Sequence, residues 1–381
     1  MIYLDNSATS FPKPNEVYDF MINFYRQHGV NPGRTGFDAA IETGDLVTNT
    51  RKMLTKLFNG GDDYNRLTFS YNATDSLNMI IQGLAEKGAH VITTMLEHNS
   101  VLRPLYSLQQ KGLIDVTYVP FDERGYVDPD DVKKAIRPNT KFVVCTHCSN
   151  VIGTIQPLKE IGKICHENGL IFVVDGSQGA GAVDLDMQAQ NIDVYCFTGH
   201  KCLMGPTGIG GSYVREGITI NHTRYGGTGV RSAVEGHLEE YPYRLEAGTM
   251  NLLGIAGLYA GVKWITEKGI MNIHDQEMRL WKKLRDGLRE IDGVTVYCAT
   301  SVENQNPVLS FNIKGSTAEK VGQFLDVDYE IACRTGLQCA PKVHMGIGTF
   351  DLHGTVRFSI GAFTTEEEID TAIAAVKEIA E

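Results

Sequence analysis

Short apolar runs alternate with stretches of helical periodicity over the middle of the chain. The runs are rich in β-branched and aromatic residues and cover 67–71, 91–94, 116–119, 142–145, 171–174, 194–197 and 209–214. Continuous apolar strands separated by helices are typical of a mostly parallel sheet with helices on both faces. The pattern therefore predicts an α/β fold with a large domain built on a seven-stranded sheet.

The pattern changes after about residue 252. Two long helical stretches lead into short strand patterns near 294, 308–313 and 356–360, and a last helix follows from Thr365. Fewer parallel-strand signals predict a smaller α+β domain, to which the N-terminal segment returns. We expect a large domain over 16–254 and a small domain made of 1–15 and 255–381.

Charge and composition exclude several classes of function. The chain has 35 Lys and Arg against 46 Asp and Glu, a formal net charge of −11, without a basic run. This argues against a nucleic-acid or anionic-membrane partner. The first residues do not show the basic segment followed by an apolar segment that is typical of a secretory leader. No apolar run approaches the roughly 18 residues of a membrane span. With 8 scattered cysteines that are expected to be reduced, we predict a cytoplasmic protein.

Polar side chains follow five of the predicted strands, at 72–75, 97–99, 149–150, 175–178 and 198–201. Each has an ordinary structural explanation when taken alone: Thr74 can cap a helix, and Lys201 can be a solvated surface lysine. However, ligands of parallel sheets bind beyond the carboxyl ends of the strands. All five segments are therefore expected to meet at one edge of the sheet.

The residue types in this set suit one cofactor, pyridoxal 5'-phosphate. A lysine in a closed pocket, here Lys201, forms a Schiff base with an aldehyde. A carboxylate, here Asp175, holds the pyridine nitrogen protonated and makes the ring an electron sink. The other donors are Thr74, Thr198 and His200 for a phosphate, His98 for stacking or proton transfer, and Asn150 and Gln178 for the ring hydroxyl.

Six motifs stand in the order typical of class V, fold-type I pyridoxal-phosphate enzymes, at 5–9, 97–98, 149–150, 174–178, 198–201 and 245–249. The segment 333–341, Cys-Arg-Thr-Gly-Leu-Gln-Cys-Ala-Pro, is similar to the catalytic-cysteine loop of the cysteine desulfurases, and most similar to the SufS-like group. The resemblance runs from Tyr3 to about Glu368, nearly the whole chain. It implies the fold-type I architecture.

The resemblance also implies roles for individual residues. Lys201 is the Schiff-base lysine, Cys339 the catalytic cysteine, and His98 the stacking residue and acid or base. The other cofactor ligands implied are Asp175 at the pyridine nitrogen, Thr74, Thr198 and His200 at the phosphate, and Gln178 and Asn150 at the ring hydroxyl. Arg357, with Arg334 and Asn150 near it, is implied to hold the substrate carboxylate, for which a planar bidentate donor is well suited.

Thr249 resembles a phosphate ligand donated by the other subunit, which implies a homodimer. The implied reaction converts L-cysteine to L-alanine and leaves a persulfide on Cys339, from which an acceptor protein takes the sulfur. L-Selenocysteine is a further implied substrate. The acceptor itself is not identifiable from the sequence.

The sequence departs from the family at several positions. Ala73 stands where relatives often carry a second hydroxyl residue, and Leu337 and Gln338 replace a pair that is often histidine in the SufS-like group. Arg34 and Arg231 lie in segments that differ from the best-known members, and we expect at most rim or dimer contacts from them.

Alternative functions stay open at this point. A class V transaminase or a β-eliminating lyase would share the cofactor site, and Cys339 would then be incidental. A catalytically silent scaffold is a third alternative. The pair Cys145 and Cys148 has the spacing of half a zinc site, but no second matching pair exists, so we expect no metal.

Overall fold

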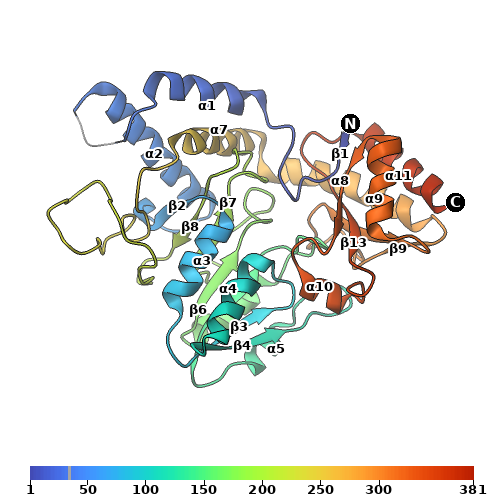
Figure 1. The fold of residues 1–381 in the computed structure, drawn as a ribbon, viewed down its shortest axis with the longest axis horizontal. Helices are drawn as coiled ribbons and strands as arrows, with labels where there is room; N and C mark the ends of the chain where they lie inside the picture. The colour runs from blue at the N-terminus through green and yellow to red at the C-terminus, as the bar shows by residue number, and fades with distance from the viewer. Residues whose placement is uncertain (33–35) are drawn as a thin grey trace.

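A computed structural model describes residues 1–32 and 36–381 of the chain, and Arg34 lies outside these residues. Figure 1 shows a central sheet with helices around it and, beside it, a second region coloured orange to red, where both termini lie. None of the described helices is long and apolar enough to cross a membrane.

The large sheet has seven strands in the order β2-β8-β7-β6-β5-β3-β4. Strand β8 runs antiparallel to both of its neighbours, and the other neighbouring strands are parallel. The prediction of a seven-stranded, mostly parallel sheet is therefore confirmed. The strands are β2 (Leu67–Ser70), β3 (Ala89–Thr94), β4 (Ile114–Val119), β5 (Thr140–Thr146), β6 (Ile171–Asp175), β7 (Val194–Thr198) and β8 (Gly210–Val214).

Helices cover both faces of this sheet. Alternate residues of a strand point to opposite faces, so Phe172 and Val174 of β6 join one hydrophobic cluster and Val173 joins another. Helices α3 (Ala73–Leu84) and α4 (Asn99–Gln110) pack on the face of Val173. The other face is covered by α2 (Asp38–Leu57), α6 (Leu158–Glu167) and α7 (Leu252–Lys268), with α1 (Asn15–His28) packed on α7.

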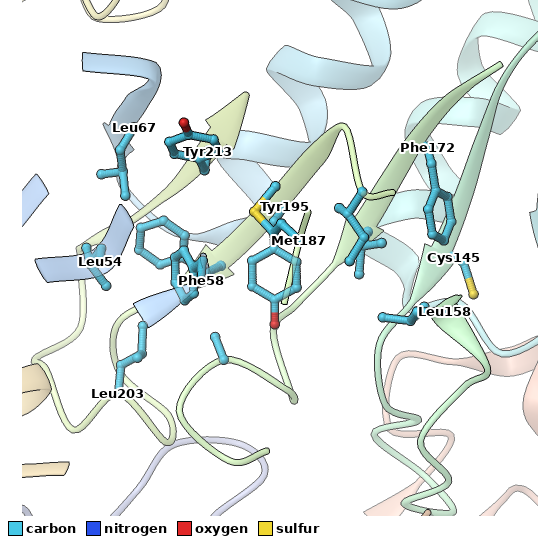
Figure 2. Close-up of a cluster of buried hydrophobic side chains, with 14 of the residues drawn as sticks. Leu54, Phe58, Leu67, Cys145, Leu158, Phe172, Met187, Tyr195, Leu203 and Tyr213 are labelled. Carbon is cyan, nitrogen blue, oxygen red and sulfur yellow. The ribbon is translucent and has the colours of Figure 1, made fainter. Parts of the chain in front are cut away.

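The core of that second face is aromatic near its centre. Figure 2 shows Phe58, Tyr195 and Tyr213 gathered there, and the ring centroids of Phe58 and Tyr195 lie 5.1 Å apart. Phe58 is the C-cap residue that follows α2, whereas Tyr195 and Tyr213 come from β7 and β8, so the cluster fixes the end of α2 on the sheet. Short elements complete this half of the chain, namely 3-10 helix η1 (Tyr64–Arg66) and helix α5 (Pro129–Lys134).

A second core lies in the orange to red region of Figure 1 and includes Leu4, Trp281, Phe311 and Phe358. Its antiparallel sheet has the order β12-β13-β10-β9, and β1 pairs in parallel with β11. The elements are β1 (Ile2–Tyr3), β9 (Val294–Val296), β10 (Val308–Ile313), β11 (Ile331–Ala332), β12 (Arg334–Gly336), β13 (Thr355–Ser359), α8 (Ile270–Arg289), α9 (Ala318–Tyr329), α10 (Pro341–Gly346) and α11 (Glu366–Ala380). The expected smaller α+β part is thus confirmed.

The division into domains at residue 254 stays a prediction. Helix α7 packs on α1 and α2, and its buried residues belong to the core of the large sheet. This packing is a reason to draw the boundary after Lys268 rather than before α7.

The two sheets meet at the loop that follows β5. The Ser310 hydroxyl donates to the Val151 carbonyl over 2.7 Å, and the Asn306 backbone N–H donates to the Gly153 carbonyl over 2.7 Å. Gly153 has φ +75°, and an added Cβ would lie 2.8 Å from the backbone carbonyl oxygens of both Asn306 and Val308. Only glycine therefore allows this approach of the two parts.

We predict that Gly153→Ala destabilises the protein by about 2–5 kcal/mol, because a left-handed conformation costs a non-glycine residue about 1–2 kcal/mol and overpacking adds about 1–3 kcal/mol. Gly217→Ala is the matched control, since Gly217 has φ +86° but no atom within 4 Å of the added Cβ. Urea denaturation of both variants measures the difference. Equal losses for both would show that the contact across the sheets is not tight.

Candidate active site

A cavity of about 300 Å³ lies where the carboxyl ends of the large sheet face the small sheet. Of the twelve residues predicted to form the site, eleven line this cavity, and Thr249 does not. The eleven are Thr74, His98, Asn150, Asp175, Gln178, Thr198, His200, Lys201, Arg334, Cys339 and Arg357. The structure thus brings together residues from both sheets, while their individual roles stay predictions.

Lys201 lies in the turn after β7. Its backbone is held by the N-terminal segment, because the Ser10 hydroxyl donates to the Lys201 carbonyl over 2.9 Å. Enclosure by protein lowers the pKa of Lys201 to about 8, which Asp175 opposes and Arg357 supports. About one tenth of the amine is therefore neutral at pH 7, far more than for an ordinary lysine, and the neutral form is the one that attacks an aldehyde.

His98 caps the N-terminus of α4. Its Nδ1 accepts a hydrogen bond from the Ser100 backbone N–H over 3.1 Å, so the ring proton of the neutral imidazole lies on Nε2. The Ser100 hydroxyl lies 2.8 Å from Nδ1 and 2.6 Å from the Thr74 hydroxyl. Burial lowers the pKa of His98 to about 4, so the ring is neutral near pH 7.

Asp175 ends β6 and is 2 % exposed. Its Oδ1 accepts hydrogen bonds from the Ser177 N–H over 3.0 Å and from the Ser177 hydroxyl over 2.5 Å. Because both bonds are made to Oδ1, Oδ2 is the oxygen that would pair with the protonated pyridine nitrogen of the predicted cofactor.

The turn after Asp175 lies against two buried rings. A Cβ on Gly176 would lie 2.2 Å from Tyr195, and one on Gly179 would lie 2.0 Å from Nδ1 of His147. The Tyr195 hydroxyl lies 3.0 Å from that Nδ1. His147 and Tyr195 therefore support the turn, a role that sequence reasoning missed; the glycines at 176 and 179 were the available signal. Among the described residues, no cluster of His, Cys, Asp and Glu could hold a metal.

Two residues that line the cavity each have a buried polar atom without a partner in the described part of the chain. Thr198 Oγ1 and His200 Nδ1 have no hydrogen-bond partner among the described residues. A buried polar group left unpaired costs about 1–3 kcal/mol, so such a pair at a cavity wall indicates a ligand. Asn72, rather than Thr74, caps α3 by accepting from the Asp75 N–H over 2.9 Å. The side chain of Thr74, in the first turn of α3, is thereby not needed as the cap.

Asn150 and Gln178 hold neighbouring segments through their amide nitrogens. Asn150 Nδ2 donates to the Gln338 carbonyl over 2.7 Å, and Gln178 Nε2 donates to the Ser7 carbonyl over 3.0 Å. Only the amide oxygens remain to accept a hydrogen bond from a ring hydroxyl.

Cys339 is exposed at the mouth of the cavity, in the loop between β12 and α10. Its φ is +58°, and that of Gln338 is +39°, so two successive non-glycine residues have left-handed backbone. Such strain persists only where surrounding contacts enforce it. The Asn99 N–H donates to the Cys339 carbonyl over 2.7 Å.

The departure at Gln338 has a structural role. This side chain is buried, and its Nε2 donates to the Thr355 carbonyl over 2.8 Å. Its Oε1 lies 2.8 Å from Nε2 of His344. Gln338 therefore anchors the loop that presents Cys339.

Arg334 and Arg357 are directly opposite each other on β12 and β13. Arg334 is exposed, whereas Arg357 is buried and donates through Nη1 to the Asn150 carbonyl over 2.9 Å. Like charges opposite one another on neighbouring strands repel. A carboxylate bound at this wall of the cavity would relieve that repulsion.

Thr249 is exposed and outside its own chain's cavity. The segment that carries it is held by a buried ion pair, in which Arg51 donates to Glu246 over 2.7 and 2.8 Å. Arg231 is exposed and pairs with Glu240 over 2.9 Å.

Comparisons with known proteins agree along the whole chain. The aminotransferase class-V family matches residues 2–371. A probable cysteine desulfurase of Methanothermobacter thermautotrophicus is 32% identical over 100% of this chain and 94% of the relative. The cysteine desulfurase IscS of Clostridium botulinum is 31% identical over 99% of this chain and 94% of the relative.

Solved structures are similar over the same extent. The apo structure of a cysteine desulfurase from Thermococcus onnurineus has a TM-score of 0.93 at 33% identity, covering 100% of this chain and 94% of that one. The cysteine desulfurase CsdA from Escherichia coli, as its S-sulfonic acid, has a TM-score of 0.88 at 28% identity, covering 99% and 94%. The similarity therefore extends over both the large and the small sheet, between which the cavity lies.

The lowered pKa of Lys201 has a consequence for stability. In the cofactor-free protein the pKa is about 8, against 10.5 for an ordinary lysine, so the unfolded chain binds more protons between these values. Stability of the wild type therefore rises with pH over this window, and the full cost of the buried charge is present below pH 8. We predict that Lys201→Met is more stable than the wild type at pH 7, by up to about 3 kcal/mol, and that this advantage shrinks from pH 8 to 10.5.

Urea denaturation of cofactor-free wild type and variant across this pH range tests the prediction. Lys56→Met, on the exposed surface of α2, controls for the loss of a lysine. A stability advantage of Lys201→Met that grows as the pH rises would contradict the lowered pKa of Lys201.

Proposed function

Because the chain belongs to the aminotransferase class-V family and is an enzyme with cysteine desulfurase activity, we propose that it uses pyridoxal 5'-phosphate to convert L-cysteine to L-alanine, with Cys339 receiving the sulfur as a persulfide. One observation carries this proposal. The exposed thiol of Cys339 lines the same cavity as the amine of Lys201 and the carboxylate of Asp175. A sulfur acceptor and the groups that activate the substrate are thus within one site.

The chemistry of the donor set fits the cofactor. The Lys201 amine would join the aldehyde, Asp175 would pair with the ring nitrogen, and the His98 imidazole would lie against the ring. Thr198 and His200 have buried polar atoms without a partner among the described residues, which a phosphate would satisfy. When bound, the cofactor supplies the electron sink that no protein side chain provides.

The protein's own groups account for binding and proton transfer. Arg357 and Arg334 would hold the substrate carboxylate at the wall opposite Lys201. A neutral Lys201 amine can take the proton from the substrate Cα, because its pKa of about 8 lies near the working pH. The neutral imidazole of His98 is a second group that can move a proton through Nε2.

Cys339 acts as a nucleophile toward sulfur. Its thiolate forms a bond with the substrate sulfur while the carbon–sulfur bond of the substrate breaks. The carbon keeps the bonding electron pair and takes a proton, which yields the methyl group of alanine. The exposure of Cys339 allows an acceptor protein to collect the sulfur.

Further parts of the proposal concern the assembly. The active form is a homodimer in the cytoplasm, and Thr249 reaches the phosphate site of the partner subunit. This explains why Thr249 is exposed and outside its own cavity. L-Selenocysteine would use the same residues as L-cysteine.

Product analysis tests the function. The protein, loaded with pyridoxal phosphate, is incubated with L-cysteine in the absence of any keto acid. Alanine and protein persulfide in equal amounts support the proposal. Pyruvate would indicate a β-eliminating lyase, and turnover that requires a keto acid would indicate a transaminase. Failure to bind the cofactor would favour a silent scaffold.

We predict that Cys339→Ser binds the cofactor normally but forms no persulfide and at least 100-fold less alanine. A hydroxyl is a far poorer nucleophile toward sulfur than a thiolate, and no cofactor contact is lost. Cofactor absorbance and alanine production are measured together. Cys333→Ser, in the same segment but outside the cavity, is the matched control. Near-normal alanine production by Cys339→Ser would refute the role of Cys339.

We predict that pyridoxal phosphate lowers the dimer dissociation constant of the wild type, because a ligand bound by both subunits favours the dimer. Thr249→Ala should weaken cofactor binding and reduce this linkage, whereas Thr371→Ala, an exposed threonine on α11, should change neither. Analytical ultracentrifugation with and without cofactor measures both. A dimer dissociation constant that is the same with and without the cofactor would exclude a phosphate site shared by the two subunits.

A further inference from the structure

Asp5 is a charged residue that contacts Arg357 of the cavity wall, and the proposed reaction does not use it. It follows β1 and forms a bridge to Ser359, at the end of β13. Its carboxylate accepts a hydrogen bond from Nη2 of Arg357 over 2.5 Å. The Arg357 side chain is 4% exposed and that of Asp5 16%, so water screens this ion pair weakly.

The bonds of Arg357 fix the plane of its guanidinium. Nη2 donates to Asp5 and Nη1 donates to the Asn150 carbonyl, so the two anchors come from the N-terminal segment and from the loop after β5. Nε of Arg357 is buried and has no hydrogen-bond partner among the described residues. A guanidinium has five N–H donors. Three of them therefore remain for a ligand after the two anchors are made.

Asp5 also changes the charge of this wall. Arg334 and Arg357 together carry two positive charges, and Asp5 offsets one of them. The wall therefore has a net charge near +1 when no ligand is bound. A site of this charge suits one carboxylate, and the same carboxylate is present in the substrate L-cysteine and in the product L-alanine.

We propose that Asp5 is a positioning residue that orients the Arg357 guanidinium toward the amino-acid carboxylate. Asp5 also lowers the affinity of Arg357 for that carboxylate, so that the product dissociates. The proposal rests on the function proposed above, because it assigns the carboxylate site to Arg357. The carboxylate of Asp5 has two effects on Arg357. Its oxygen provides an acceptor that fixes the guanidinium, and its charge competes with the ligand for the same cation.

Two substitutions separate these effects. Asp5→Asn keeps an oxygen acceptor for Nη2 but removes the charge, so the dissociation constant of L-alanine should fall roughly three- to tenfold. Asp5→Ala removes both the oxygen acceptor and the charge. The Arg357 guanidinium then loses an anchor, and the dissociation constant of L-alanine should rise by a similar factor. The KM for L-cysteine should change in the same direction as the dissociation constant, without an increase in kcat for Asp5→Asn.

The experiment is titration calorimetry of the cofactor-loaded protein with L-alanine, which reports binding without turnover. Glu16→Gln is the matched control, since it removes an acidic charge from the exposed start of α1, outside the cavity. Arg357→Ala gives the limit in which the carboxylate contact is lost. Thermal unfolding verifies that each variant is folded, and if Asp5→Ala is not, the sign of the change in Asp5→Asn decides alone.

Tighter binding of L-alanine by Asp5→Asn supports the proposal. Weaker binding by Asp5→Asn would show that the ion pair only maintains structure, and unchanged binding would show that Asp5 does not act on Arg357; either result overturns it. Failure of the proposed function is distinguishable, because the wild type would then produce no alanine and persulfide from L-cysteine in the parallel assay.

Discussion

The site depends on holding two separately packed sheets at a fixed distance across one cavity. Asp175 ends a strand of the large sheet and Lys201 follows one, whereas Arg357 lies in the small sheet and Cys339 in the loop after its strand β12. Reacting atoms must come within about 3–3.5 Å, so a small shift between the sheets would separate the two sets of groups. Everything that the cavity can do therefore rests on the contacts that bridge it.

The N-terminal segment supplies much of that bridge. The Ser359 N–H donates to the Leu4 carbonyl over 2.7 Å, which ties the segment to β13 of the small sheet. A few residues later, the Thr9 hydroxyl donates to the His200 carbonyl over 2.9 Å, beside the lysine. Ser7 and Ala8 lie between these anchors and line the cavity. The segment thus connects both sheets, through its backbone at Leu4 and through a side-chain hydroxyl at Thr9.

The enclosure created in this way also sets the protonation states. Desolvation lowers the pKa of Lys201 to about 8 and that of His98 to about 4, so His98 is neutral at pH 7 and about one tenth of the Lys201 amine is. Behind His98, burial raises the pKa of Glu97 to about 8, although its Oε1 accepts hydrogen bonds from the Thr94 hydroxyl and the Thr146 N–H. Glu97 joins the ends of β3 and β5 directly beneath the site.

Much of this arrangement is predictable from the sequence, because the strands of a parallel sheet are continuous apolar runs and their ends carry the ligands. All seven runs contain a strand, and the segments after five of them meet at the cavity. The pairing of Asp5 with Arg357 was not predictable, since the two are 352 residues apart and β1 has only two residues. The support that His147 and Tyr195 give to the turn after Asp175 was missed as well, because the glycines at 176 and 179 indicate a close approach but do not identify the rings that make it. Thr249 lies outside the cavity of its own chain, and its role stays a prediction.

The central claim is that sulfur leaves the substrate for Cys339 and for no other thiol of the chain. A single turnover with L-cysteine, followed by alkylation under non-reducing conditions and peptide mass mapping, tests it most directly, because each of the 8 cysteines is observed separately. The account predicts one added sulfur atom on the peptide that contains Cys339, in amounts equal to the alanine released, and none on the others. Alanine released without sulfur on Cys339, or sulfur first on another cysteine, would contradict it.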